Sequence, residues 1–304
     1  MSTNSNNSKH GSSSLTVVAW LIALLVSTLP NAVWQSLAGT APSCLLWVKV
    51  GLLVVLIILT FGWERIRPLR LFFLMLLVLV PAYQWLAAWL PTLLLWKQWF
   101  GQAEWIGGTA VIQLIKIGVA FLMMGILFLT GRQRRDYFLT RGELDAPAES
   151  IRWLGIKVST PWSHVAPIIA VCAFVPVLAV LWLSNSHSSA LLIKALPYLP
   201  AAIIFAAMNG FSEEMSFRAP VLTTLQAQVG RQQAVLLTAT YFGLAHYSGG
   251  ISSGIVWVVF AGFLGWLMGR SMFETRGAFW AWLIHFVEDI PIYFFMAVAY
   301  LGQN

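Results

Sequence analysis

The sequence predicts an all-α protein that crosses a membrane as a polytopic bundle of about eight or nine helices. Of its 304 residues, 59% are hydrophobic and only 10% are charged, whereas about 25% are charged in a typical soluble domain. The mean hydropathy is +0.78. The apolar runs reach about 20 residues and are apolar on every side, which favours membrane helices over a β-barrel. This composition excludes a soluble globular enzyme, a disordered regulator and a disulfide-rich secreted module.

The apolar runs divide the chain in order. A polar tail over residues 1–14 precedes a first helix, which we expect to be retained because no small-residue cleavage site follows it. Four helices are expected in an N-terminal membrane region over 15–130, and the others in a C-terminal core over 166–304. The candidate spans are residues 15–36, 43–62, 71–96, 109–130, 166–184, 198–228, 232–247, 251–269 and 278–301.

The charged residues of the loops predict the orientation. Arginines and lysines gather in the loops at 64–70, 131–165 and 270–276, whereas 37–42 and 97–108 hold almost no net charge. By the positive-inside rule the three basic loops are cytoplasmic, with 131–165 as the one sizeable loop. The net charge of +7 is then a signal of topology, and no nucleic-acid partner is expected. The pattern is compatible with a bacterial inner membrane.

Ionisable residues inside apolar spans are costly, so they indicate function unless they reach the membrane surface. Lys49, Lys116 and Lys194 each stand alone, and we expect their side chains to extend along the helix to the interface. The C-terminal third differs, because seven ionisable residues lie among its apolar helices. They are Glu213, Glu214, Arg218, His246, His285, Glu288 and Asp289.

Helix geometry predicts how these residues group. Glu214 and Arg218 are four residues apart, so they share a face and can pair. Glu213 points about 100° away, which leaves its carboxylate for chemistry. The spacing of four recurs in Phe242 with His246 and in His285 with Asp289.

These residues resemble the motifs of the CAAX-protease and bacteriocin-processing family of intramembrane proteases, which includes the Ras-converting CAAX endopeptidases. The family pattern is EExxxR, then FxxxH, then HxxxN or HxxxD, on three helices, and the resemblance covers about residues 198–301. Two positions depart from it: Ala219 stands where many relatives have Gly, and Asp289 where the eukaryotic enzymes have Asn. The matching residues are Glu213, Glu214 and Arg218, then Phe242 and His246, then His285 and Asp289.

The resemblance implies hydrolysis of a peptide bond in a membrane-associated protein or peptide, within or beside the lipid. Glu213 is then the expected general base, with His246 holding the nucleophilic water. His285 and Asp289 are expected to orient or stabilise the oxyanion. The supporting residues are Glu214, Arg218 and Phe242.

Other interpretations of the mechanism and the function stay open. No cofactor is certain, but Glu213, His246 and His285 form a candidate zinc site with an open fourth position, although no HExxH motif is present. A proton-coupled transporter would also use buried Glu and His residues, although the first half of the chain lacks buried acids. A non-catalytic scaffold or immunity protein of the same family, and polar residues that only hold helices together, are the remaining alternatives.

Overall fold

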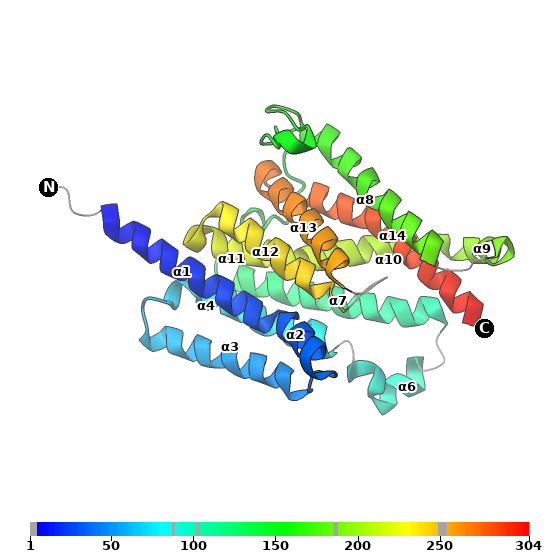
Figure 1. Cartoon of the computed structure of the whole chain (residues 1–304), viewed down its shortest axis with the longest axis horizontal. Coiled ribbons are helices and arrows are strands. Elements are labelled where there is room, and N and C mark those ends of the chain that lie inside the picture. Colours follow the sequence, from blue (N-terminus) through cyan, green and yellow to red (C-terminus); the bar gives the residue numbers. More distant parts are fainter. Residues whose placement is uncertain (1–4, 87–88, 101–103, 185–187, 249–253, 304) are drawn as a thin grey trace. The chain divides into compact units, whose positions relative to one another are not determined.

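The computed structural model describes residues 5–86, 89–100, 104–184, 188–248 and 254–303 (Figure 1). Within these ranges the chain is helical and contains no β-strand. Two isolated β-bridges join Pro147 to Pro161 and Ile151 to Ile156. The predicted all-α fold class is confirmed.

The helices also confirm an integral, multi-pass membrane protein. In the described part of the chain, seven helical segments are long and apolar enough to cross a membrane, or eight if a bent pair is counted as one span. Eight is the lower figure of the prediction. The helix over Arg231–Ala245, expected as a span over 232–247, is not among them, because its 15 residues are fewer than the roughly 20 that a span needs.

The chain forms two compact units, and each unit is built from two separate stretches of sequence. Unit 1 comprises Met1–Ala88 and Phe217–Gly269, and unit 2 comprises Trp89–Ser216 and Arg270–Asn304. The predicted division into regions at 15–130, 131–165 and 166–304 stays a prediction.

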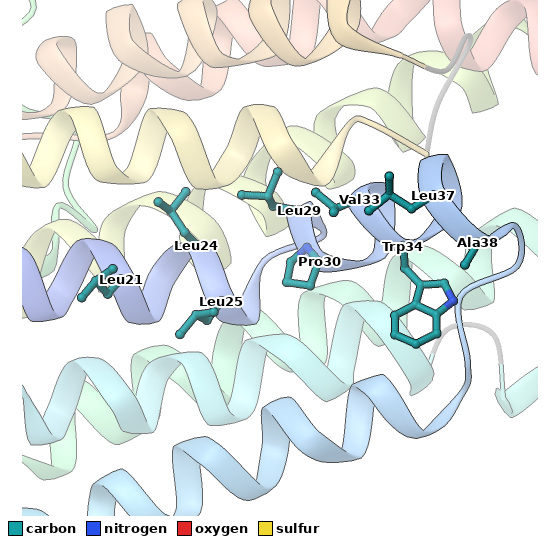
Figure 2. A pocket seen from close by; sticks show the side chains of 9 residues that line it. All are labelled: Leu21, Leu24, Leu25, Leu29, Pro30, Val33, Trp34, Leu37 and Ala38. Atoms are coloured by element: carbon teal, nitrogen blue, oxygen red, sulfur yellow. The ribbon is translucent and has the colours of Figure 1, made fainter.

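Unit 1 begins with a span that is broken. α1 (Ser5–Val26) and α2 (Leu29–Ala38) are bent by 51° relative to each other. Pro30 lies in the first turn of α2, where a missing N–H is tolerated. The hydroxyl of Ser27 accepts a hydrogen bond from the backbone nitrogen of Leu29 at 3.0 Å. This contact gives a hydrogen-bond partner to a backbone N–H group at the break. The single helix expected over 15–36 is therefore wrong. An apolar hollow lies on this bend, lined by side chains of α1 and α2 (Figure 2).

The other helices of unit 1 follow the break. They are α3 (Cys44–Gly62), α4 (Arg70–Pro81), a π-helix (Ala82–Leu86), α11 (Ala219–Val229), α12 (Arg231–Ala245) and the greater part of α13 (Ile255–Thr275).

Lys49 of α3 does not reach the interface as expected, since its side chain is buried. Its ammonium donates to the backbone oxygen of Ser27 at 2.6 Å and to the side-chain oxygens of Asn31 and Gln84. A helix that stops leaves its last carbonyl groups without helical partners. Lys49 satisfies one of these at the break, so the interface prediction is wrong for this residue.

In unit 2, three helices pack around a core of aromatic and small residues: α7 (Trp105–Leu129), α10 (Leu199–Glu213) and α14 (Phe279–Gln303). α14 lies against α10 and α8, and α10 also lies against α7. Alanines in the core let the helix backbones approach closely. The core residues are Trp105, Ala202, Phe205, Ala206, Tyr293 and Ala297. The helices of unit 2 are α6 (Leu94–Phe100), α7 (Trp105–Leu129), α8 (Trp162–Ser184), α9 (Ser189–Ala195), α10 (Leu199–Glu213) and α14 (Phe279–Gln303).

The segment 131–165 has two short 3₁₀ turns and packs on the turn that precedes α14. The backbone nitrogen of Glu143 donates to the carbonyl of Thr275 at 2.7 Å. Gly142, with a φ of +75°, lies so close that a Cβ there would come within 2.5 Å of the Thr275 oxygen and 2.8 Å of the Gly277 nitrogen. Glycine is required at position 142 for both its backbone conformation and this contact.

Replacing Gly142 by Ala is therefore expected to lower the stability of the protein. The left-handed conformation costs about 1–2 kcal/mol for an L-residue, and the collision with two backbone atoms adds to it. Gly155 is the matched control, because it has the same φ of +75° and open space around its Cβ position. Melting temperatures in detergent should fall more for Gly142→Ala than for Gly155→Ala. Equal falls would mean that the contact with the α14 turn contributes nothing.

Candidate active site

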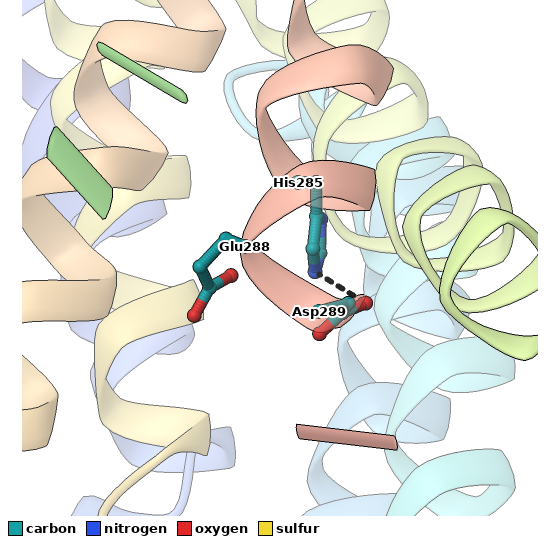
Figure 3. A group of neighbouring side chains, drawn as sticks. All are labelled: His285, Glu288 and Asp289. Atoms are coloured by element: carbon teal, nitrogen blue, oxygen red, sulfur yellow. Dashed lines mark ion pairs between the residues drawn. The ribbon is translucent and has the colours of Figure 1, made fainter. Parts of the chain in front are cut away.

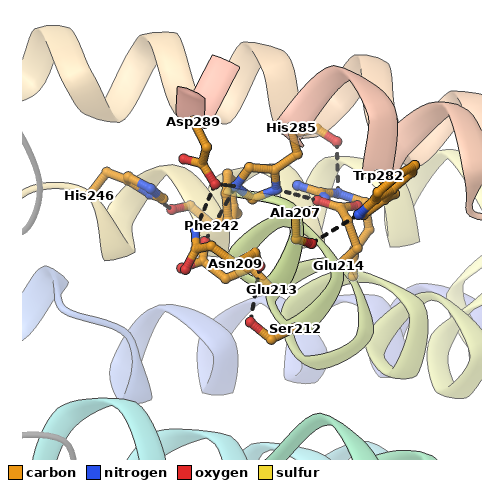
Figure 4. Close-up of polar contacts among 12 residues, drawn as sticks. Ala207, Asn209, Ser212, Glu213, Glu214, Phe242, His246, Trp282, His285 and Asp289 are labelled. Atoms are coloured by element: carbon orange, nitrogen blue, oxygen red, sulfur yellow. Dashed lines mark hydrogen bonds and ion pairs between the residues drawn. The ribbon is translucent and has the colours of Figure 1, made fainter. Parts of the chain in front are cut away.

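The close approach of α10 and α14 places the first and third motifs together. Gly210 on α10 lies where a Cβ would come within 3.2 Å of the Phe286 nitrogen on α14. The indole nitrogen of Trp282 donates to the carbonyl of Ala207 at 3.0 Å. These contacts set the register of the two helices, and the predicted site residues of unit 2 lie beside them (Figure 4).

His285 lies at the centre of this cluster and is buried. Its Nδ1 lies 2.8 Å from Oε1 of Glu214, whose side chain is fully buried. Because an ionised carboxylate only accepts, Nδ1–H is the donor. The other nitrogen, Nε2, lies 3.6 Å from Oε2 of Glu213 and 3.7 Å from Oδ2 of Asp289. Unit 2 therefore brings together four predicted residues, with one imidazole among three carboxylates.

Two further residues complete the cluster, and the sequence analysis did not assign them to it. The ammonium of Lys116 on α7 forms an ion pair with Oε1 of Glu213 at 2.6 Å. It also donates to Oδ1 of Asn209, whose Nδ2 donates to Oδ2 of Asp289 at 2.9 Å. The expectation that Lys116 extends to the interface is wrong, because a carboxylate and an amide lie within its reach. Asn209 carried a signal, since it is a polar residue four positions before Glu213 on an apolar helix.

Within the first motif the helix changes its winding. α10 ends at Glu213, and Glu214–Arg218 forms a π-helix. Single π-turns interrupt α-helices mostly at functional sites. The expected pairing of Glu214 with Arg218 assumed 3.6 residues per turn, which this segment does not have. That pairing stays a prediction.

Unit 1 holds the second motif. His246 caps the C-terminal end of α12, and its Nδ1 lies 2.9 Å from the carbonyl of Phe242. A carbonyl only accepts, so Nδ1–H donates and Nε2 is the acceptor nitrogen of the neutral ring. The two rings lie 4.6 Å apart, as the spacing of four predicted. Arg218 donates from Nε to the carbonyl of Gly265 at 3.2 Å, with its guanidinium 4.8 Å from the Phe242 ring.

Imidazole and carboxylate ligands suit a divalent metal ion such as zinc. Among the described residues, His285, Glu288 and Asp289 on α14 each offer a ligand atom within 4.8 Å of the others (Figure 3). Of the predicted set of Glu213, His246 and His285, the first and last lie together in unit 2. The chemistry of these donors fits a metal ion, and the metal assignment stays a prediction.

The fold and this cluster define a class: a multi-pass helical membrane protein with carboxylates and a histidine buried between its helices. Residues 195–290 match the family described as "Type II CAAX prenyl endopeptidase Rce1-like". The match spans about a third of the chain and includes all three motifs, so the resemblance is confirmed over this segment. No curated protein and no solved structure matches the chain.

Proposed function

We propose that this protein is an intramembrane endopeptidase that hydrolyses a peptide bond of a membrane-associated protein or peptide. At the level of the family, the Rce1-like match supports a protease of the CAAX type. The observation that carries the proposal is the contact of three carboxylates, those of Glu213, Glu214 and Asp289, with the buried imidazole of His285. Helix association alone does not require three carboxylates around a histidine.

The proposed reaction needs a water, a base and donors for the oxyanion. Glu213 takes a proton from water as the water oxygen attacks the carbonyl carbon of the scissile bond. His285 acts as the imidazolium: its Nδ1–H donates to Glu214, and its Nε2–H donates toward the oxyanion with Asp289 beside it. When the C–N bond breaks, the proton on Glu213 passes to the leaving amine. His246 keeps its predicted role in holding the water.

A metal ion is compatible with the donors on α14 but is not needed for these steps. His285, Glu288 and Asp289 would hold it, and it would supply Lewis-acid polarisation when bound. Cleavage by protein purified without metal, and unchanged by a chelator, would exclude this contribution.

The membrane and the substrate complete the proposal. The alternation of basic and uncharged segments supports a bacterial cytoplasmic membrane with the basic segments at 64–70, 131–165 and 270–276 on the inside. The last of these, expected as a loop, lies mostly in the final turns of α13 instead. Substrates are then membrane-anchored proteins or peptides whose scissile bond lies at or near the lipid. Membrane lipid is the surrounding partner.

Comparison of membrane-protein termini in cells that produce wild type or Glu213→Ala tests this function. New termini that appear with wild type alone, and the same cleavage in proteoliposomes, are the expected result. The proteoliposomes should also be assayed with a pH-sensitive dye inside. Proton flux that depends on Glu213, without cleavage, would instead identify a transporter, and neither activity would indicate a non-catalytic scaffold.

A further inference from the structure

The ion pair of Lys116 with Glu213 joins the predicted site to a helix outside the matched segment. Lys116 lies near the middle of α7 (Trp105–Leu129), whereas the family match begins at residue 195. A lysine halfway along a membrane span is costly, so it is retained where it has a function or a partner. Here the partner is the carboxylate that we propose as the general base.

Lys116 contacts one oxygen of the Glu213 carboxylate, and the other oxygen faces His285. The ammonium lies 2.6 Å from Oε1, whereas Oε2 lies 3.6 Å from Nε2 of His285. Each oxygen of the carboxylate therefore faces a different partner, and rotation about the last side-chain bond would exchange them. Because the two oxygens are equivalent, the ion pair does not select one of them; it fixes the plane of the carboxylate, so that one oxygen always faces the imidazole.

The same ammonium reaches the third motif through one amide. It donates to Oδ1 of Asn209, and Nδ2 of Asn209 donates to Asp289 at 2.9 Å. Because an ammonium has only donors, this contact fixes which end of the Asn209 amide faces Asp289. Lys116 therefore orients two carboxylates of the cluster, one directly and one through Asn209.

Two contacts without a charge also hold α7 against its neighbours. Trp105 packs edge-on against Phe205 of α10, with ring centroids 5.5 Å apart. The amide of Gln113 donates to the hydroxyl of Tyr293 on α14 at 2.6 Å. These contacts lie on the same helix as Lys116 and hold α7 in place without a charge.

We propose that Lys116 is a positioning residue for the hydrolysis, which orients Glu213 and, through Asn209, Asp289. The inference rests on the proposed endopeptidase function. It gives the N-terminal half of the chain a part in catalysis, because α7 then supplies a positive charge that contacts Glu213.

Purified full-length protein in proteoliposomes tests this role with two variants. Lys116→Met removes the charge at similar length, and Lys116→Arg keeps it. We expect Lys116→Met to lower kcat about 100-fold, because small misplacement of a catalytic group costs this much, with KM changed less than about twofold. Lys116→Arg should recover most of the loss. Lys194→Met is the matched control, since Lys194 is an exposed lysine of the same unit.

A double-variant cycle with Glu213→Gln separates positioning from a structural role. If Lys116 acts through Glu213, Lys116→Met should cause little further loss in a chain that already carries Glu213→Gln. The double variant removes both charges of the ion pair. If Lys116→Met alone does not fold, the double variant is still expected to fold. Its folding and residual activity can then be compared with those of Glu213→Gln. Wild-type kcat in folded Lys116→Met, or equal losses in Lys116→Met and Lys116→Arg, would overturn the inference. Wild type that cleaves no substrate would overturn the endopeptidase function itself, and the inference with it.

Discussion

Glu213→Gln is expected to lower the rate of peptide-bond cleavage by about 10²–10⁴-fold, the contribution typical of a general base. Glutamine has nearly the shape of glutamate but cannot take a proton from water. Its side-chain oxygen can still accept from Lys116, so the packing between α7 and α10 should persist. Cleavage of a substrate peptide by purified protein, measured as kcat and KM, gives the loss.

A matched variant shows whether the loss at Glu213 is specific. Glu143→Gln changes an exposed carboxylate of unit 2 in the same way, and wild-type rates are expected. Equal amounts of both variants in the membrane fraction, with similar elution on size-exclusion chromatography, would exclude misfolding. If Glu213→Gln retains more than about a tenth of the wild-type rate, Glu213 is not the general base.

His285→Asn and His285→Gln are expected to lose cleavage to a similar degree, about 10²–10⁴-fold, but to differ in stability. The amide nitrogen of Asn occupies nearly the position of Nδ1, so it can still donate to Glu214. Gln places its amide near Nε2 instead and leaves Glu214 without this donor. A hydrogen bond to a charged group contributes about 1.5–3 kcal/mol, so His285→Gln should have the lower melting temperature.

The expected loss of cleavage and the expected difference in stability can be tested independently. His164→Asn is the control, because His164 is an exposed histidine of the same unit. Active His285→Asn would show that the atom at the Nε2 position has no part in the chemistry. Equal melting temperatures for the two variants would show that the contact of His285 with Glu214 does not stabilise the protein.

The meeting of Glu213 and Glu214 with His285 was implied only by the family resemblance. Apolar composition was enough to predict the helical membrane fold, and motif spacing was enough to place His285 and Asp289 on one helix face. Both depend on local properties: the length of apolar runs, and the side-chain positions that a helix imposes on residues four apart. Phe242 and His246 follow the same rule, and their rings are in contact.

The features that the sequence did not predict depend on which helices are neighbours. Lys116 is far from the motifs in sequence, and only the packing of α7 against α10 gives it Glu213 as a partner. Lys49 was likewise assigned to the interface because the break at Ser27, which supplies one of its acceptors, was not anticipated. The π-helix at Glu214–Arg218 changes the hydrogen-bond pattern by one residue per turn, which hydrophobic periodicity does not reveal.

The contact of residues 140–149 with the start of α14 has a practical consequence for work on fragments. The segment meets that turn mostly through main-chain atoms: Ala278 donates to the carbonyl of Thr140 at 3.1 Å, and the indole of Trp280 donates to that of Leu144 at 3.0 Å. A polypeptide cut to residues 195–290 would lose these partners together with α7 and α8, and would expose the surfaces of α10 and α14 that those helices cover. We therefore expect residues 195–290 not to fold on their own. Work on fragments should therefore use two fragments that together contain the whole chain, divided outside residues 140–149 and α14. Such a pair would keep the contacts that truncation to residues 195–290 removes.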